Sequence, residues 1–484
     1  MDSIDAREGF IKKYQGLPKQ IKASLWFIVA NVLVKGISFI TLPVFSRLLT
    51  TEEYGRINVY QSWVSVISII TTLTIWGGVF NVGVVKYEER KYEMISSFQG
   101  MTVSLTLGAA IVCMVLLPLI QPLLKMSKLM VISLFLEILA QIPFYLWSTE
   151  QRYIYEYKKL IIATILMSII IPITGVVAIK HTSHKVEAKI ISSVVVQLAF
   201  GIVFFAVNQW RGRRFYDREF WKYGFMFNIV LVPHYLSMQI LNQSDRIMID
   251  NMCGASDAGI YSVAYTFALL LSLVANGINS SLTPHIYQCL KSKQVQQLKK
   301  QTTAVIMLVT VFFAGLVSFL PDVFHLLLPE SYYPALKVIP PVTAGAFFLF
   351  LYPLFGSVEF YYEENRYITV ASVIGAVLNL ALNFYFIKEF GFAAAAYTTL
   401  FCYACLSLCH YVFMGKVMRK QGIEFEIYDK KSLLLMSAFV VLFSIFMVLV
   451  YDSFIIRWII IVAVLLVGII KRKNIVAMFY SLRR

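Results

Sequence analysis

The chain has 484 residues, of which 59% are hydrophobic and only 14% are charged, and its mean hydropathy is +0.72. A soluble domain carries far more charge on its surface, so this composition excludes a soluble protein and predicts an integral membrane protein. The formal net charge of +16 is then best explained by contact of basic loops with the anionic cytoplasmic leaflet rather than by nucleic-acid binding, for which no motif is present.

Apolar runs of about 20 residues, enough to cross ~30 Å of hydrocarbon as a helix, recur from residue 23 almost to the end of the chain. The short alternating strands of a membrane β-barrel look different. We predict an all-α polytopic fold with about 14 transmembrane helices. They are expected at residues 23–45, 57–85, 98–121, 127–149, 160–179, 190–207, 224–244, 259–283, 303–320, 335–358, 367–387, 391–415, 432–451 and 454–470.

The two longest basic connections, at 208–223 and 416–431, divide these spans into groups of six, six and two. Because each group of six is even, both groups would enter the membrane from the same side, as in a parallel repeat around a central cavity. The predicted parts are a cytoplasmic tail (1–22), an N-lobe (23–207), a basic linker (208–223), a C-lobe (224–415), a basic loop (416–431), helices 13 and 14 (432–470) and a basic tail (471–484).

The distribution of basic residues predicts which loops and termini lie on the cytoplasmic side of the membrane. If the N-terminus is cytoplasmic, 31 of the 43 lysines and arginines fall in cytoplasmic segments and nine in outer loops. Such an excess is the signature of cytoplasmic loops. Both termini are therefore predicted on the cytoplasmic side. The first apolar run is too long and begins too late for a signal peptide, so we expect no cleavage.

Two short sequences suggest the repeat directly. Residues 46–60, "SRLLTTEEYGRINVY", and residues 255–265, "ASDAGIYSVAY", each follow an apolar run and lie 204 positions apart at their glycines, Gly55 and Gly259. In both, an acidic residue stands two positions before the glycine and a valine four positions after it. The same location and sidedness in the two groups of six favour copies of one unit over coincidence.

Polar residues recur at helical spacing along one face of spans one, two, seven and eight, the pairs that flank these glycines. Hydroxyl residues in such stripes can serve only to pack helices, and that alternative stays open for span two. Amides, aromatic rings and cations are harder to explain in this way. The candidates are Asn31 and Lys35 in span one, Tyr235, Gln239, Asn242 and Arg246 in span seven, and Asn276 and Asn279 in span eight.

Two charged residues lie deep inside predicted spans, Lys35 in span one and Glu137 in span four, and Asp245 with Arg246 ends span seven. A charge at mid-membrane costs about 2.5 to 3.5 kcal/mol, so it should face a partner, water or a ligand. An ion pair between Lys35 and Glu137 is the structural alternative, and a cavity that holds an anionic group is the functional one. Adjacent helical residues point about 100° apart, so Asp245 and Arg246 are expected to contact different neighbours.

The cysteine and histidine residues predict neither a disulfide framework nor a metal site. Most of the six cysteines lie in spans, which argues against a disulfide framework. Cys402, Cys405 and Cys409, next to His410, share one helix face, where small thiols are more readily explained by packing than by a metal. No metal and no organic cofactor is predicted.

The chain resembles the polysaccharide and oligosaccharide-lipid flippases (Wzx type) of the multidrug/oligosaccharidyl-lipid/polysaccharide (MOP) exporter superfamily. The resemblance lies in "SRLLTTEEYGRINVY", in "LNQSDRIMIDNMCGASDAGIYSVAY" across spans seven and eight, and in the fourteen-span layout. It implies two six-helix lobes that alternate between inward-open and outward-open states. It also implies that the protein flips polyprenyl-pyrophosphate-linked oligosaccharides to the outer leaflet of the bacterial inner membrane, for surface polysaccharides such as O-antigen or capsule.

The resemblance implies roles for the candidate residues. A pyrophosphate needs cations, for which Lys35, Arg47 and Arg246 are candidates. Amides both donate and accept hydrogen bonds, which suits sugar hydroxyls, and Tyr235 could stack on a sugar face. No Walker A pattern occurs, so an ion gradient is the expected energy source, with Glu137 or Asp245 binding H⁺ or Na⁺.

The sequence leaves other functions open. A drug/cation antiporter of the same superfamily would favour carboxylates over cations in its cavity, and a peptidoglycan-precursor flippase would share the chemistry with a different sugar. A membrane enzyme would need a large polar loop with paired carboxylates, which the chain lacks. The expected partners are the lipid-linked oligosaccharide and the membrane. A polysaccharide-assembly protein at the basic loops remains open.

Overall fold

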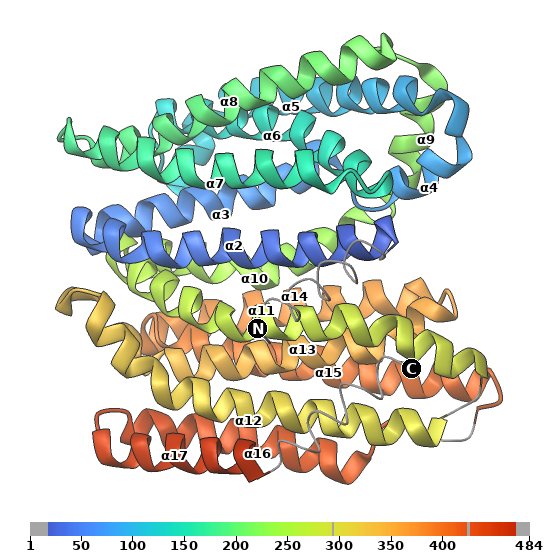
Figure 1. Cartoon of the computed structure of the whole chain (residues 1–484). Helices are drawn as coiled ribbons and strands as arrows, with labels where there is room; N and C mark the ends of the chain where they lie inside the picture. The colour runs from blue at the N-terminus through green and yellow to red at the C-terminus, as the bar shows by residue number, and fades with distance from the viewer. Residues whose placement is uncertain (1–17, 293–294, 424–425, 471–484) are drawn as a thin grey trace, which may run out of the picture. The chain divides into compact units, whose positions relative to one another are not determined.

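The computed structural model describes residues 18–292, 295–423 and 426–470, and over these residues all regular secondary structure is helical (Figure 1). The helices are α2 (Lys19–Leu48), α3 (Thr51–Thr72), α4 (Val79–Lys86), η1 (Glu88–Arg90), α5 (Lys91–Leu124), α6 (Lys128–Tyr153), α7 (Tyr157–Lys180), α8 (Lys185–Gly212), α9 (Arg218–Ile229), α10 (Val232–Met252), α11 (Ala255–Ser292), α12 (Val295–Leu327), η2 (Glu330–Lys337), α13 (Ile339–Tyr361), α14 (Asn365–Phe390), α15 (Ala394–Lys420), α16 (Lys430–Val450) and α17 (Phe454–Ile470). The all-α expectation is confirmed.

Each predicted span contains a helix, and the length and composition of the helices support eleven or twelve of the fourteen predicted crossings. Within the described residues, eleven helices are long and apolar enough to cross a membrane, and the bent pair α9 and α10 raises the number to at most twelve. The predicted fourteen also included α3, whose first turns carry Glu52, Glu53 and Arg56, and α17, which has only 17 residues. Helix α3 is therefore too polar, and α17 too short, to count as a membrane crossing by length and composition.

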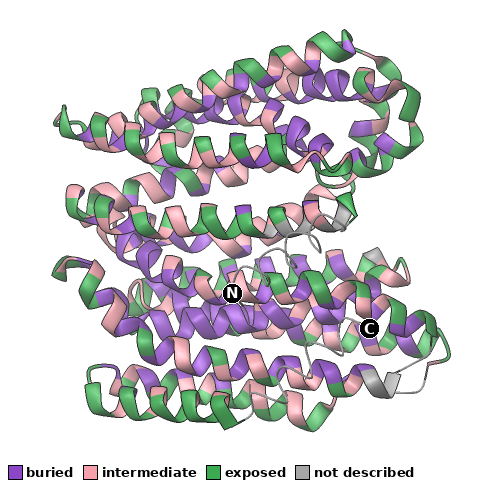
Figure 2. Cartoon of the chain, in the orientation of Figure 1, coloured by how far each residue is buried: buried purple, intermediate pink, exposed green. Residues whose placement is uncertain are grey.

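Two compact units make up the chain: the described residues of Met1–Leu48 with Trp63–Val232, and those of Leu49–Ser62 with Pro233–Arg484. The predicted lobes differ from these units, because residues 49–62 were assigned to the N-lobe yet pack with the second unit. In the second unit α13 packs against α11 and α15 and is buried along most of its length (Figure 2). In contrast, α16 and α17 expose many large apolar side chains, as lipid-facing helices do.

The first turns of α3 and α11 cross at two glycines within the second unit. A Cβ atom on Gly55 would lie 1.7 Å from the carbonyl oxygen of Ala255, and one on Gly259 would lie 2.2 Å from the carbonyl oxygen of Thr51. Each carbonyl belongs to the residue four positions before the partner glycine, so the contact is reciprocal. The hydroxyls of Thr51 and Ser256 also share a hydrogen bond of 2.7 Å. The two glycines that the sequence pattern singled out thus touch each other.

In the first unit, the predicted span at 57–85 is interrupted by a turn. Helix α3 ends at Thr72 and α4 begins at Val79, and between them Leu73 and Thr74 adopt left-handed φ angles of 52° and 48°. Residues with side chains in this region carry strain of about 1–3 kcal/mol each and persist only where their surroundings hold them. A second break, just after Ile229, separates α9 from α10.

Ion pairs lie at the ends of several helices. Lys19 contacts Glu156 at 2.7 Å, and Lys420 contacts Glu364. The hydrogen bond from each lysine lowers the pKa of its glutamate, so both pairs persist to more acidic pH than isolated carboxylates would. Because all four groups lie near solvent, their contribution to stability is small.

Candidate functional site

A buried carboxylate lies at the centre of a polar network in the second unit. Asp245 of α10 is 1% exposed. Its Oδ2 accepts hydrogen bonds from the hydroxyls of Tyr261 (2.5 Å) and Thr399 (2.8 Å), and its Oδ1 accepts one from the Asn383 amide (2.6 Å). These three donors come from α11, α15 and α14 and are all neutral. The carboxylate is therefore satisfied by hydrogen bonds, but these bonds bring no positive charge to it.

A further ring of neutral groups surrounds these donors. Asn379, one turn before Asn383 on α14, donates to Thr399 Oγ1 (3.2 Å) and accepts from Ser244 (2.9 Å) and from Asn383 (3.2 Å). Thr398 donates to Asn383 Oδ1. The network thus gathers carboxylate, amide and hydroxyl oxygens, the ligands that hard cations prefer. A bound cation or a proton would neutralise the buried charge.

Arg246, the next residue, contacts different groups. Its Nη1 donates to the carbonyl oxygen of Asn242 (2.8 Å) and to Gln243 Oε1 (2.9 Å), and its guanidinium lies 4.2 Å from the centre of the Tyr265 ring. The carboxyamide oxygen of Asn242 accepts from Tyr265 (3.2 Å) and Tyr403 (3.0 Å). The expectation that Asp245 and Arg246 contact different neighbours is confirmed. One helix thus carries a buried anion and a buried cation side by side, each held by neutral groups.

The remaining candidates of the second unit are less tightly held together. Tyr235 and Gln239 are half-buried on α10. On α11, Asn276 is exposed, whereas Asn279 is buried and donates to the carbonyl oxygen of Phe350 (3.1 Å). The Asn279 amide oxygen has no hydrogen-bond partner among the described residues. Asn279 therefore has one free acceptor, while Asn276 lies at the surface of the unit.

In the first unit the candidates do not form one cluster. Asn31, Lys35 and Arg47 are exposed on α2. Glu137 is 2% exposed and accepts hydrogen bonds from the amides of Gln141 (3.2 Å) and Gln197 (3.1 Å). Within the described ranges no ion pair joins Lys35 to Glu137, so the structural alternative from the sequence is not observed.

The histidine and cysteine positions give no metal site. In the described part of the chain, no group of three or more His, Cys, Asp and Glu side chains is arranged to hold a metal ion. His410, which the sequence places beside three cysteines, contacts Glu359 of α13 at 3.0 Å, and both are buried.

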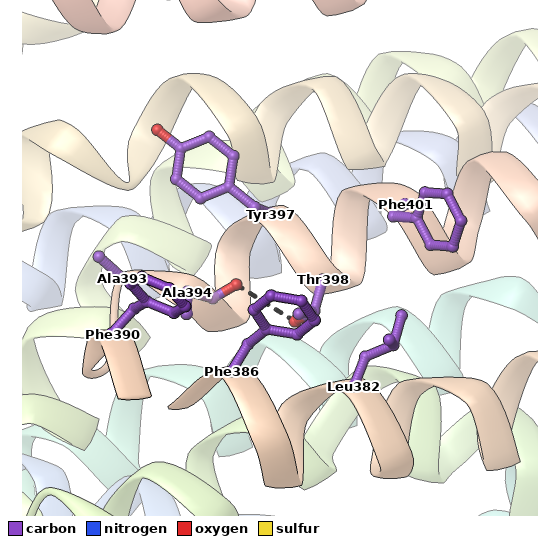
Figure 3. A pocket seen from close by; sticks show the side chains of 8 residues that line it. All are labelled: Leu382, Phe386, Phe390, Ala393, Ala394, Tyr397, Thr398 and Phe401. Carbon is purple, nitrogen blue, oxygen red and sulfur yellow. Dashed lines mark hydrogen bonds between the residues drawn. The ribbon is translucent and has the colours of Figure 1, made fainter. Parts of the chain in front are cut away.

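An apolar groove of about 540 Å³ adjoins the network where α14 and α15 meet. Figure 3 shows the aromatic rings that line it, from Phe386, Phe390, Tyr397 and Phe401, together with the hydroxyl of Thr398. Thr398 belongs to both features, because it lines the groove and donates to Asn383. The groove and the carboxylate network therefore share one side chain.

The sequence reasoning identified Asp245 but missed the residues that surround it. Asn379 and Asn383 are spaced by four in a predicted span, and Thr398 and Thr399 follow four alanines and Tyr397. The two asparagines have the helical spacing of the other polar stripes, but they lie outside the four helices next to the glycines. Their approach to Asp245 depends on tertiary packing.

Comparison with known proteins agrees with this picture. Residues 21–290 match a family described as "Polysaccharide biosynthesis protein", and residues 231–385 match "MatE". A Haemophilus influenzae protein named "Lsg locus putative protein 1" is 24% identical over 390 residues, which cover 75% of this chain and 90% of that protein.

Solved transporters have the same fold. The structure titled "Lipid II flippase MurJ, inward closed conformation" aligns with a TM-score of 0.68 and 15% identity, covering 94% of this chain and all of that one. An inward-facing multidrug resistance MATE family transporter of the MOP superfamily aligns with a TM-score of 0.60 and 11% identity, covering 82% and 96%. Identities this low show the fold alone. The family match spans more than half of the chain, which therefore belongs to the family described as "Polysaccharide biosynthesis protein".

Proposed function

We propose that this protein moves polyprenyl-pyrophosphate-linked oligosaccharide repeat units from the cytoplasmic to the outer leaflet of the bacterial inner membrane. The movement is driven by an ion gradient and supplies the synthesis of a surface polysaccharide such as O-antigen or capsule. Family membership supports the link to polysaccharides. The similarity to a lipid II flippase supports a lipid-linked sugar as the transported class.

The observation that carries the proposal is the pair of opposite charges on α10. Asp245 is buried among neutral oxygen and amide groups, so it can take up H⁺ or Na⁺. Arg246 is 7% exposed, and the groups that accept its hydrogen bonds are neutral. The guanidinium is therefore available to bind an anionic group. The two neighbours could thus connect ion binding with recognition of pyrophosphate through one helix.

The remaining candidates complete the proposed substrate contacts. Lys35 and Arg47 are exposed cations that can approach the pyrophosphate, and Glu137 is a second buried carboxylate for ion coupling. Sugar hydroxyls would be bound by the amides, with Tyr235 as a stacking surface. Those amides belong to Asn31, Gln239, Asn242, Asn276 and Asn279.

Topology and partners form part of the same proposal. The distribution of 31 of 43 basic residues supports cytoplasmic N- and C-termini. The cytoplasmic basic loops provide a surface for a polysaccharide-assembly protein, while the lipid-linked oligosaccharide itself would be met within the membrane.

Reconstitution tests the proposal. Wild type, Lys35→Ala and Arg246→Ala are placed in liposomes, and the passage of a fluorescent polyprenyl-pyrophosphate oligosaccharide between leaflets is followed under a pH or sodium gradient. We expect wild type to move the lipid and Arg246→Ala to lose at least about tenfold in rate, because a charged hydrogen bond contributes about 1.5–3 kcal/mol. Lys35→Ala should be slowed as well. Arg56→Ala serves as control, since Arg56 is exposed and pairs with Glu52 at 2.7 Å.

Equal rates in all variants would make the two cations structural. Two further outcomes identify the competing functions. Export of a cationic dye without lipid movement would identify a multidrug antiporter, which the "MatE" match over residues 231–385 favours as second candidate. Movement of a peptidoglycan precursor alone would identify a lipid II type flippase, which the fold similarity favours.

A further inference from the structure

Two helix breaks meet in the first unit. The first lies between α3 and α4, and the second follows α9. Gly78, which precedes α4, lies against the second break: a Cβ atom there would be 2.9 Å from Leu231 Cδ1 and 3.3 Å from Asn228 Oδ1. The backbone N–H of Val79 donates to Asn228 Oδ1 (3.4 Å). The two interrupted helices are therefore joined at their breaks by Asn228.

The first break is held in a conformation that its residues rarely adopt. Leu73 and Thr74 have consecutive positive φ angles, and Thr74 is β-branched, which makes it an outlier in this region. Local hydrogen bonds hold the turn: Gly77 N–H donates to the Thr74 carbonyl (2.8 Å), and Thr74 N–H to Thr72 Oγ1 (3.3 Å). Strain of this kind gathers at binding sites, so it calls for a functional explanation.

Polar atoms at the breaks are left without partners. Asn228 is 0% exposed, yet its Nδ2 finds no hydrogen-bond partner among the described residues, and the same holds for Thr74 Oγ1. Buried polar groups are nearly always hydrogen-bonded, so two such atoms at one structural irregularity indicate a ligand that supplies the missing bonds. The amide needs an acceptor, and the hydroxyl can take either role.

An aromatic surface adjoins these atoms. Trp76 belongs to the first break and stacks on Tyr145 of α6, with 4.6 Å between ring centres and 20° between planes. Tyr145 is 38% exposed, Trp76 is half-buried, and Gly77 beside it is exposed. Residues that adjoin the two buried polar atoms are therefore accessible: Trp76, Gly77 and Tyr145. Broken membrane helices commonly present backbone and side-chain polar groups to a substrate in this manner.

The chemistry of the groups selects the ligand. A phosphate would call for cations, whereas the unpartnered atoms here are a neutral amide and a neutral hydroxyl. Sugars combine hydroxyls that both donate and accept with C–H faces that stack on aromatic rings. We infer that the paired breaks, with Trp76, Thr74 and Asn228, form a binding site for a sugar residue of the transported lipid. This inference rests on the proposed function and specifies the part of the substrate that the first unit recognises.

The place of the breaks along the helices suits the entry of substrate. Helix α4 has eight residues and α9 has twelve, so the breaks lie roughly 12 Å and 18 Å from the ends that the proposed topology puts in the cytoplasm. A sugar entering from the cytoplasm would reach this depth before the outer leaflet. The site thus belongs to the first stage of transport.

Binding of two lipids to the full-length protein in nanodiscs tests this inference. The probes are the polyprenyl-pyrophosphate oligosaccharides extracted from the bacterium that makes this protein, and polyprenyl pyrophosphate without sugar. We expect wild type to bind the glycosylated lipid more tightly. Trp76→Ala should weaken that binding about tenfold and change binding of the bare lipid less than about twofold. Trp26→Ala is the matched control. Trp26 also stacks on a tyrosine, Tyr157, with 6.5 Å between ring centres, but it lies on α2 and not at a helix break.

Thr74→Val keeps the side-chain shape and removes the hydroxyl. If the hydroxyl has only a structural role, its removal leaves the affinity for the glycosylated lipid unchanged. The stability of the protein then stays the same or increases. If it binds sugar, the glycosylated lipid alone binds more weakly. This variant also decides the matter should Trp76→Ala not fold. Equal loss for both lipids, or no change for either, overturns the sugar site.

If wild type binds both lipids equally and still transports the glycosylated one, this inference is wrong and the proposed function is unaffected. Wild type that neither binds nor moves either lipid removes the proposed function, and the sugar site with it.

Discussion

Asp245→Asn is expected to weaken strongly the dependence of transport on the ion gradient while leaving the protein folded. Asparagine has the same shape and can still accept the hydrogen bonds of Tyr261 and Thr399, which lie 2.5 Å and 2.8 Å from Oδ2. It carries no charge to bind H⁺ or Na⁺. We expect the apparent affinity for the coupling ion to fall by about tenfold to hundredfold, the range that 1.5–3 kcal/mol for a charged interaction gives.

The measurement is the rate of lipid movement in proteoliposomes under a pH gradient and, separately, a sodium gradient. Thermal unfolding in NaCl against KCl shows whether sodium binds directly, since a ligand of the native state raises the melting temperature. Asp257→Asn is the control, because Asp257 lies in the first turn of α11 and outside the network. Retention of full gradient dependence by Asp245→Asn would move the coupling site elsewhere, with Glu137 as the next carboxylate to replace.

Gly55→Ala is expected to destabilise the protein by at least about 3 kcal/mol, at or above the upper end of ordinary overpacking. The new methyl would lie 1.7 Å from the carbonyl oxygen of Ala255, a backbone atom that no side-chain rotation can move. Helices α3 and α11 would have to separate, which would also break the hydrogen bond between Thr51 and Ser256. Gly259→Ala meets the carbonyl oxygen of Thr51 and should have a similar effect.

Fluorescence-monitored thermal unfolding in detergent measures this effect. Gly36→Ala and Gly108→Ala are matched controls in helices α2 and α5, where a Cβ atom would meet nothing within 4 Å. These should be neutral or stabilising by about 0.5–1 kcal/mol, the ordinary effect of replacing glycine by alanine inside a helix. Because Gly55 and Gly259 share one contact, the double variant should lose less than the two single losses together. A melting temperature of Gly55→Ala equal to that of Gly36→Ala would contradict the crossing.

The hydropathy pattern located the helices well but missed the interruptions. Residues 57–85 read as one span because Leu73, Ile75 and Trp76 are as apolar as their neighbours. Hydropathy reports the side chain and contains no information on the sign of φ, so the left-handed pair at Leu73 and Thr74 could not be seen in it. The two successive glycines that follow were the available signal for a turn.

The candidate site shows a similar division. Charge in a membrane span is costly wherever it occurs, so Asp245 and Arg246 could be identified from the sequence alone. Their partners could not: Asn383 is 138 positions from Asp245 and Thr399 is 154 positions away. Likewise, an ion pair between Lys35 and Glu137 was a reasonable alternative, but Glu137 has amide partners instead. Tertiary packing decides which polar groups meet. The spacing of residues within one helix does not report it.

The length of α11 gives the glycine crossing a mechanical consequence. Thirty-three residues separate Gly259 from Ser292 at the other end of this helix, a distance of about 50 Å at 1.5 Å per residue. Rotation about the crossing by about 15°, an amplitude known from subunit rotations in other proteins, would displace the far end by roughly 13 Å if the helix stayed straight. Because neither glycine has a side chain, the helices would turn here about the hydrogen bond between Thr51 and Ser256, and α11 would act as a lever with its pivot at the crossing.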